Sequence, residues 1–129
     1  MAAKNEALKS YRELEVWKKG IDLVEMVYRL TKKFPPEERF GLTAQMQRAA
    51  VSIPANVAEG YGRSHRGDYL HHLSIAKGSL YELETHVTIA ARLGIASREQ
   101  ALEVWHLSQE VSKMLYALVV SLSKQKPVP

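Results

Sequence analysis

The sequence predicts an all-α fold, an up-down-up-down antiparallel four-helix bundle. Four segments place apolar residues at intervals of three and four, which puts them on one face of a helix, and no segment has the pattern of a strand. Short connections join the segments, and such connections make consecutive helices antiparallel. The chain has 129 residues, of which 46% are hydrophobic, enough for one domain with a buried core.

The first helix is expected to begin near Tyr11. Ser10 and Glu13 have the spacing of a capping box, although the helix could begin a few residues later. Two apolar stripes follow, wider together than one seam, so this helix should meet neighbours on two sides. Pro35 and Pro36 should end it, because proline cannot continue the hydrogen-bond ladder. The stripes are Trp17, Ile21, Val24 and Tyr28, and Val16, Leu23, Val27, Leu30 and Phe34.

The second helix is predicted from about Leu42 to Tyr61, with Pro54 inside it. An interior proline removes one hydrogen bond and crowds the carbonyl of Ala50, at a cost of about 3 kcal/mol. Apolar spacing continues on both sides, so we expect a kink at Pro54 rather than an end. Asn56 lies among apolar residues and must find hydrogen-bond partners, which we expect in a loop or a neighbouring subunit.

Gly60 and Gly62 close this segment. A nucleotide-binding loop is a poor interpretation, because no strand precedes them and no Gly-Lys-Ser/Thr follows. We therefore predict that one of the two glycines terminates the helix.

The third helix should begin at Asp68 as N-cap and end at Gly94. Gly78 in its interior costs roughly 1 kcal/mol relative to alanine, so a packing reason is expected. Ser97 and Gln100 form a second capping box, which begins the fourth helix, and Lys124 marks its end. The expected organisation is a flexible segment 1–10, a bundle 11–124 and a flexible tail 125–129. The core positions predicted for these two helices are Tyr69, Leu73, Ala76, Leu80, Leu83, Val87 and Ala90, then Val104, Ser108, Val111, Leu115, Leu118 and Leu122.

The formal net charge of +4 is concentrated in the first 80 residues. Residues 81–129 are balanced, with five Lys/Arg and five Asp/Glu. A basic surface favours RNA or DNA as a partner, and the alternative is an ordinary solvated face. The candidate nucleic-acid-binding residues are Lys18, Lys19, Arg29, Lys32, Lys33, Arg48, Arg63 and Arg66.

Other function classes find little support in the sequence. The chain has no cysteine and no HExxH pair among its five histidines, so we expect no metal site and no cofactor. No apolar run reaches the roughly 20 residues that span a bilayer, and the N-terminus is unlike a signal peptide. We expect a cytoplasmic protein with no membrane partner.

One motif suggests an enzyme. Arg66 and His71 have the Arg-x-x-x-x-His spacing of a class of helical ribonucleases, in which both residues act on the scissile phosphate. Gly67 stands where that class usually has a polar residue, and a chance match is expected at roughly 0.3 per chain. We prefer the interpretation that both residues lie on a solvated loop and first helical turn.

Three stretches resemble a known family. They are "YRELEVWKKG", "FPPEERFGLTAQMQRAAVSIPANVAEGYGR" and "YLHHLSIAKGSLYELETHV", and the resemblance extends from about Tyr11 to Leu122. The family is the four-helix bundle proteins encoded in intervening sequences of bacterial large-subunit ribosomal RNA genes. The accessory protein of diversity-generating retroelements is a relative that assembles as a pentamer.

The resemblance implies a homopentameric ring of bundles without established enzymatic activity. In the retroelement branch it further implies a basic surface that binds nucleic acid and a reverse transcriptase. Taken with the charge distribution, it predicts a non-catalytic oligomeric scaffold that binds RNA, DNA or a nucleoprotein partner. The alternatives are a metal-independent ribonuclease that uses Arg66 and His71, and an adaptor that binds only protein.

Overall fold

A computed structural model describes residues 10–124. They form four long helices, with no strand among them, so the predicted fold class is confirmed for this part of the chain. The helices are α1 (Glu15–Thr31), α2 (Leu42–Tyr61), α3 (Arg66–Arg92) and α4 (Arg98–Ser123), and two short 3-10 helices are η2 (Tyr11–Glu13) and η3 (Pro36–Glu38). The predicted flexible segments, apart from Ser10, lie outside the described residues.

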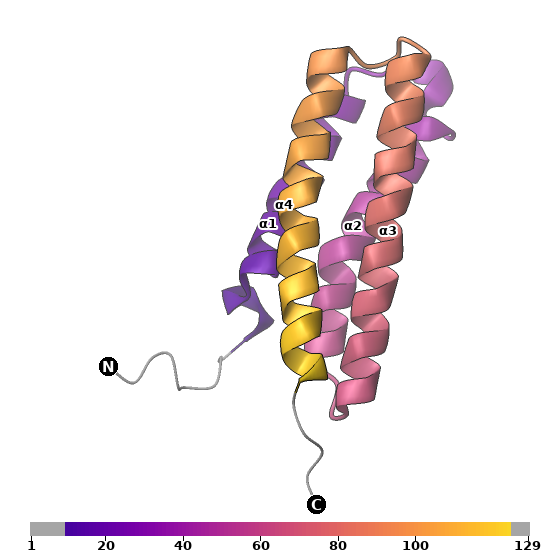
Figure 1. Cartoon of the computed structure of the whole chain (residues 1–129). Helices are drawn as coiled ribbons and strands as arrows, with labels where there is room; N and C mark the ends of the chain where they lie inside the picture. Colours follow the sequence, from indigo (N-terminus) through magenta and orange to yellow (C-terminus); the bar gives the residue numbers. More distant parts are fainter. Residues whose placement is uncertain (1–9, 125–129) are drawn as a thin grey trace, which may run out of the picture.

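Neighbouring helices run antiparallel, side by side (Figure 1). α2 and α4 each contact both α1 and α3. The connections between α1 and α2 and between α3 and α4 lie at one end of the bundle, and the connection between α2 and α3 lies at the other (Figure 1). The core contains the apolar stripes of all four helices, including the fully buried Leu23, Ile53, Leu83 and Val111.

α1 begins later than Ser10, which the sequence had left open. The Ser10 hydroxyl accepts a hydrogen bond from the Arg12 backbone N–H at 3.1 Å and caps η2, whereas α1 begins at Glu15. Its wide apolar surface meets α2 on one side and α4 on the other, as predicted. The helix ends at Thr31, ahead of the two prolines.

α2 has the predicted bounds and continues through Pro54. The proline therefore does not end the helix, and the kink stays a prediction. Pro54 is buried against α1, where a Cβ added to Gly20 would lie 3.3 Å from Pro54 Cβ. A glycine opposite the proline ring thus lets α1 and α2 approach closely, a pairing that the sequence analysis missed.

One of the two glycines, Gly62, ends α2 as predicted, whereas Gly60 has another role. Gly62 is the C-cap with a φ of −77°, an ordinary right-handed conformation. Gly60 is buried inside α2, and a Cβ there would lie 2.9 Å from His72 Cβ and 2.9 Å from Tyr69 Cδ1. Gly60 therefore brings α2 and α3 together instead of terminating the helix.

α3 begins two residues before the predicted N-cap. His65 occupies the N-cap position and Asp68 lies in the first turn. The carboxylate of Asp68 interacts favourably there with the positive end of the helix dipole. The end is as predicted, because Gly94 has a φ of +73°. The backbone N–H groups of Gly94 and Ile95 then bond to the carbonyls of Ala91 and Ala90, which is a Schellman motif.

Gly78 has no packing reason within the described residues, contrary to expectation. It lies on the exposed face of α3, and a Cβ added there would meet nothing within 4 Å.

α4 begins at the predicted capping box. The Ser97 hydroxyl accepts from the Gln100 N–H at 3.1 Å, and the Gln100 side chain accepts from the Ser97 N–H at 2.9 Å. Lys124 is the C-cap, as expected. Among the described residues, no helix is long and apolar enough to cross a membrane.

Candidate functional site

The eight cations predicted to bind nucleic acid do not form one patch. α2 has 20 residues, which extend about 30 Å, and the predicted residues lie toward both of its ends. Lys18, Lys19, Arg63 and Arg66 lie toward the end that contains the α2–α3 connection. The other four lie on the C-terminal part of α1 and on the first half of α2: Arg29, Lys32, Lys33 and Arg48.

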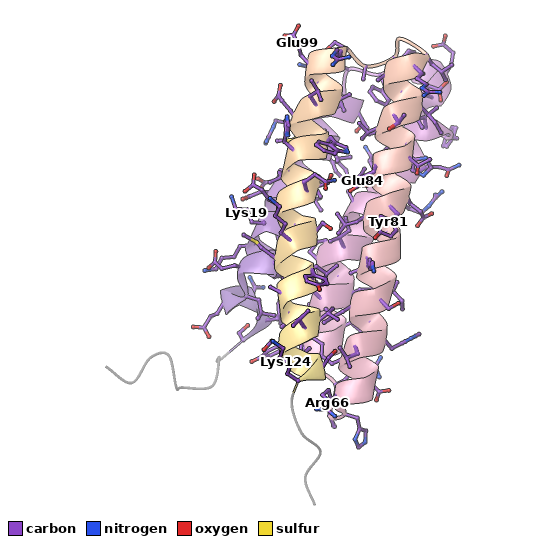
Figure 2. All side chains as sticks on the ribbon, viewed as in Figure 1. Lys19, Arg66, Tyr81, Glu84, Glu99 and Lys124 are labelled. Atoms are coloured by element: carbon purple, nitrogen blue, oxygen red, sulfur yellow. The ribbon has the colours of Figure 1, made fainter. Side chains whose placement is uncertain are left out.

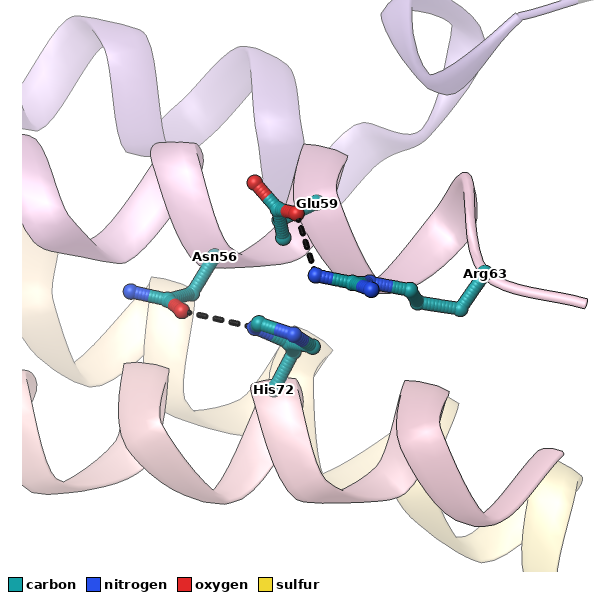
Figure 3. A network of polar contacts seen from close by, with 4 residues as sticks. All are labelled: Asn56, Glu59, Arg63 and His72. Carbon is teal, nitrogen blue, oxygen red and sulfur yellow. Dashed lines mark hydrogen bonds and ion pairs between the residues drawn. The ribbon is translucent and has the colours of Figure 1, made fainter. Parts of the chain in front are cut away.

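The first group is largely neutralised by carboxylates. Lys18 pairs with Glu15 at 3.2 Å and Lys19 with Glu110 at 3.4 Å. The third ion pair joins Arg63 Nη2 and Glu59 Oε2 at 2.6 Å (Figure 3). Each of these pairs cancels charge locally, which weakens the attraction for a phosphate.

Arg66 is held by the end of α4. Its guanidinium donates to the carbonyl oxygen of Leu122 at 3.4 Å. Figure 2 shows Arg66 close to Lys124, at the end of the bundle opposite Glu99.

The opposite end contains cations without carboxylate partners. Among the described residues, Arg29, Lys32 and Lys33 at the end of α1 form no ion pair. The fold adds Arg92 from the end of α3 and Arg98 from the start of α4, and neither forms an ion pair. We call these five residues the cationic end.

Four carboxylates share this end of the bundle. Glu38 accepts a hydrogen bond from the Leu42 N–H, and Glu37, Glu99 and Glu103 lie nearby in η3 and the first turns of α4. The excess positive charge is therefore modest, but the arginine and lysine heads at this end remain available for phosphate.

Arg92 and Arg98 were not among the predicted residues, because the charges of residues 81–129 balance to zero. The signal that could have identified them is position, because both flank the α3–α4 connection, which an antiparallel bundle places beside the end of α1.

Arg48 lies apart from the cationic end. It lines a cavity of about 260 Å³ between α2 and α3 that also contains Ser52, Ser79 and Glu82. The carboxylate of Glu82 disfavours an anion there, so Arg48 is a weak candidate for binding phosphate.

A pocket lies beside the cationic end, between the end of α3 and the start of α4. Its volume is about 330 Å³, and we call it the Trp105 pocket. Trp105 is 42% exposed and its ring packs edge-to-face with His106, with the ring centroids 5.5 Å apart. The remaining lining residues are apolar, hydroxyl-bearing or cationic: Val87, Thr88, Ala91, Arg92, Arg98, Ala101 and Leu102.

A larger groove follows the same two helices toward their other ends. The α3–α4 groove has a volume of about 740 Å³, and its apolar floor includes Leu73 and Leu115. Tyr81 and Tyr116 lie at its edges, and Tyr116 is 70% exposed. Between the groove and the Trp105 pocket, Glu84 accepts hydrogen bonds from Gln109 at 2.9 Å and Ser108 at 3.4 Å. Figure 2 shows Tyr81 and Glu84 on α3, facing α4.

Asn56 finds its partners within the same chain. Its amide nitrogen donates to the carbonyl and the hydroxyl oxygens of Ser52, at 2.9 and 3.0 Å. Its amide oxygen faces His72 Nδ1 at 3.0 Å, so that nitrogen carries the proton (Figure 3). The Ser79 hydroxyl donates to that of Ser52 at 2.8 Å. The expected loop contact was wrong, because this polar network joins α2 to α3.

Arg66 and His71 contact different parts of the bundle. Both lie on α3, five residues apart, which separates them by about 140° around the helix axis. Arg66 contacts the end of α4, whereas the exposed His71 packs edge-to-face with His72 at 5.8 Å. The expectation that Arg66 lies in a loop was wrong, since α3 begins at that residue.

Two further features concern chemistry. Within residues 10–124, no group of three or more His, Asp or Glu side chains is placed to hold a metal ion. Burial, together with the charge of Tyr61, raises the pKa of Tyr69 from 10.0 to about 12. The two rings pack edge-to-face at 6.2 Å, so Tyr69 is a packing residue between α2 and α3.

The chain was compared with known proteins. A search of curated proteins found no significant match. A solved structure from Bacteroides thetaiotaomicron VPI-5482, a protein of unknown function from the S23 ribosomal protein family, matches with a TM-score of 0.75 and 26% identity. The match covers 81% of this chain and 97% of that one. A family model matches residues 12–117, and the chain therefore belongs to the 23S rRNA-intervening sequence protein family.

Proposed function

We propose that the protein is a non-catalytic, homo-oligomeric scaffold that binds RNA through its cationic end. The observation that supports this most is the convergence of five cationic side chains from α1, α3 and α4 at one end of the bundle. None of the five forms an ion pair with another described residue. They are Arg29, Lys32, Lys33, Arg92 and Arg98. Toward the opposite end, the predicted cations Lys18, Lys19 and Arg63 are paired with glutamates.

Phosphate is the ligand that suits these side chains. A guanidinium presents a planar fork of donors that matches two phosphate oxygens, and an ammonium supplies a compact charge. Each contact with a phosphate releases a condensed counterion, so affinity depends steeply on salt.

Assembly would multiply these weak contacts. The resemblance to pentameric relatives supports a ring, in which the cationic end would be repeated once per subunit. Linked sites bind with an avidity far above that of one site. We place the contact between subunits at the α3–α4 groove, because the largely exposed rings of Tyr81 and Tyr116 line it. α1 is a poorer choice, because it buries most of its apolar surface against α2 and α4.

The test is binding to a structured RNA and to DNA of matched length across a salt series. For each phosphate contact, the log–log slope of affinity against salt should be roughly −0.7 to −0.9. Reversing Lys32 and Lys33 to glutamate should weaken binding at low salt and make the slope shallower. Reversing Lys18 and Lys19 changes the net charge equally and is the matched control, for which we expect a smaller loss.

Equal losses from the two double variants would show that only net charge matters, and the cationic end would be abandoned. No binding at low salt would favour the second candidate, an adaptor whose partner is a protein, such as a reverse transcriptase.

The ribonuclease alternative has less support, because the Arg66 guanidinium bonds the Leu122 carbonyl at the end of α4. Cleavage of single-stranded RNA without metal, abolished by His71→Ala, would revive it.

A further inference from the structure

We infer that the Trp105 pocket binds one unstacked base of a single-stranded nucleic acid, while Arg92 and Arg98 hold the flanking phosphates. This inference rests on the proposed function and names the ligand class of the cationic end. It combines a cavity, an exposed aromatic ring and two arginines that line the same pocket.

The pocket has the size and surface for a base. Its volume of about 330 Å³ falls at the small end of the range of roughly 300 to 1,000 Å³ for small-molecule sites. Ala91, Ala101 and Leu102 provide apolar walls of limited bulk. Trp105 offers a large aromatic surface, and the edge-to-face contact with His106 restricts its orientation. A base that moves from water into this pocket would bury its apolar faces against these walls.

The charged residues that line the pocket, Arg92 and Arg98, are both cationic. Arg92 comes from the last turn of α3 and Arg98 from the first residue of α4, so they approach the cavity from opposite sides of the connection. No carboxylate is among the residues that line the pocket. Glu103 lies on the α1 side of α4, where it lines a separate cavity with Arg29 and Lys33.

A single strand fits this arrangement better than a duplex. In a duplex the faces of each base are covered by its neighbours, so an aromatic side chain cannot stack on them without unpairing. In a single strand the base can turn out and stack on an aromatic ring, while cationic side chains follow the backbone. The cationic end attracts any nucleic acid, and the Trp105 pocket therefore adds a preference for single strands over duplexes.

The experiment uses the fluorescence of Trp105. The chain has two tryptophans, so Trp17→Phe leaves Trp105 as the single reporter. In this background a ten-nucleotide oligouridylate should quench the emission as it binds, and a duplex RNA of equal phosphate concentration should quench much less. Replacing Trp105 by alanine should weaken binding of the oligouridylate by about 5- to 150-fold, the range measured for loss of one base–aromatic stack.

Two variants separate stacking from general effects. Phe40→Ala removes another exposed aromatic ring, outside both the Trp105 pocket and the α3–α4 groove, and should leave the affinity unchanged. Arg98→Ala should weaken binding of both the single strand and the duplex, because both contain phosphate. Helical circular dichroism of the Trp105→Ala variant should match that of the parent.

Three results would overturn the inference. The first is an unchanged affinity for oligouridylate in Trp105→Ala. The second is equal quenching by the duplex, with salt-dependent binding intact, which would leave the proposed function standing. The third is a Trp105 emission that iodide cannot quench in the free protein, which would show that another copy of the chain covers the pocket. A complete absence of binding to both RNAs at low salt would instead overturn the proposed function as well.

Discussion

Asn56 makes three hydrogen bonds, two to Ser52 within α2 and one to His72 that joins α2 to α3. An amide in an apolar neighbourhood is stable only if its donors and acceptor are satisfied, and here a serine one turn earlier and a histidine on the next helix satisfy them. Within residues 10–124, no buried side-chain nitrogen or oxygen lacks a partner.

Replacing Asn56 by alanine should therefore destabilise the protein by about 1–3 kcal/mol, because Ser52 and His72 lose their partner in a half-buried site. Urea unfolding of the variant and the parent measures the difference. Thr85→Ala is the control, since its hydroxyl bonds the Tyr81 carbonyl at 2.8 Å on the exposed face and its loss should cost less than about 0.5 kcal/mol. A smaller loss for Asn56→Ala than for this control would contradict the assigned role.

Tyr69 should make stability depend on pH under alkaline conditions. Its folded-state pKa is raised to about 12, above the ordinary value of 10.0. The unfolded chain therefore loses this proton first, and stability falls as the pH rises from about 10 towards 12. Tyr69→Phe should flatten this part of the profile, measured as urea midpoints between pH 8 and 11.5. An unchanged slope in the variant would show that other groups cause the loss.

The sequence predicted at the residue scale that Asn56 needs partners, but not which ones. A hydrogen-bonding requirement is a property of the residue itself. Its partner His72 is 16 positions away, and only the packing of α2 on α3 brings the two together.

At the scale of the helix, two glycines with the same intrinsic cost have opposite surroundings. Gly60 has His72 and Tyr69 within 3 Å of where a Cβ would lie, and Gly78 has nothing within 4 Å. Alanine at position 60 would force α2 and α3 apart, and we expect it to destabilise the protein by about 1–3 kcal/mol. Alanine at position 78 should stabilise it by about 0.5–1 kcal/mol, because glycine is the poorer helix former.

Thermal unfolding of Gly60→Ala and Gly78→Ala measures both changes in stability. The two variants make the same substitution, so they differ only in its surroundings. A destabilising Gly78→Ala, together with a loss of assembly, would reveal that another subunit packs on that face. A neutral Gly60→Ala would mean that α2 and α3 can separate slightly at no cost.

Helix bounds were predictable wherever the signal is local. The capping box at Ser97 and Gln100, the left-handed Gly94 and the extent of α2 depend on residues close together in the chain. Asp68 was mistaken for an N-cap because the backbone of α3 turns helical two residues earlier, and nothing in its side-chain type distinguishes a cap from a first turn. Gly20 opposite Pro54 could not be predicted, since their contact depends on how two helices cross.

For the whole molecule, we expect a homo-oligomer, and the resemblance supplies five as its number. Light scattering at micromolar concentration should give five times the 14.6 kDa mass of one chain. Tyr116→Asp should lower that mass, because it puts a charge at the edge of the α3–α4 groove. Phe40→Asp is the control, since Phe40 is 87% exposed outside the groove. A monomer for the parent protein would refute the assembly.

The fold was predictable at this scale and the site was only partly so. Four periodic segments with short connections specify the bundle, but a surface depends on which ends meet. Arg29, Lys32 and Lys33 were among the predicted cations, whereas Arg92, Arg98 and Trp105 join them only through the antiparallel order of the helices.

The first and last described residues, Ser10 and Lys124, lie at the same end of the bundle, away from the cationic end (Figure 1). This placement has a practical consequence for handling the protein. A dye or a surface anchor attached beside Ser10 or Lys124 would leave the proposed RNA surface facing solution. Immobilisation near these residues is therefore the natural format for binding measurements. A circular permutant, in which a linker joins the original chain ends and the chain is cut in the α3–α4 connection, would instead place the new termini beside Arg92 and Arg98. These new termini should obstruct binding.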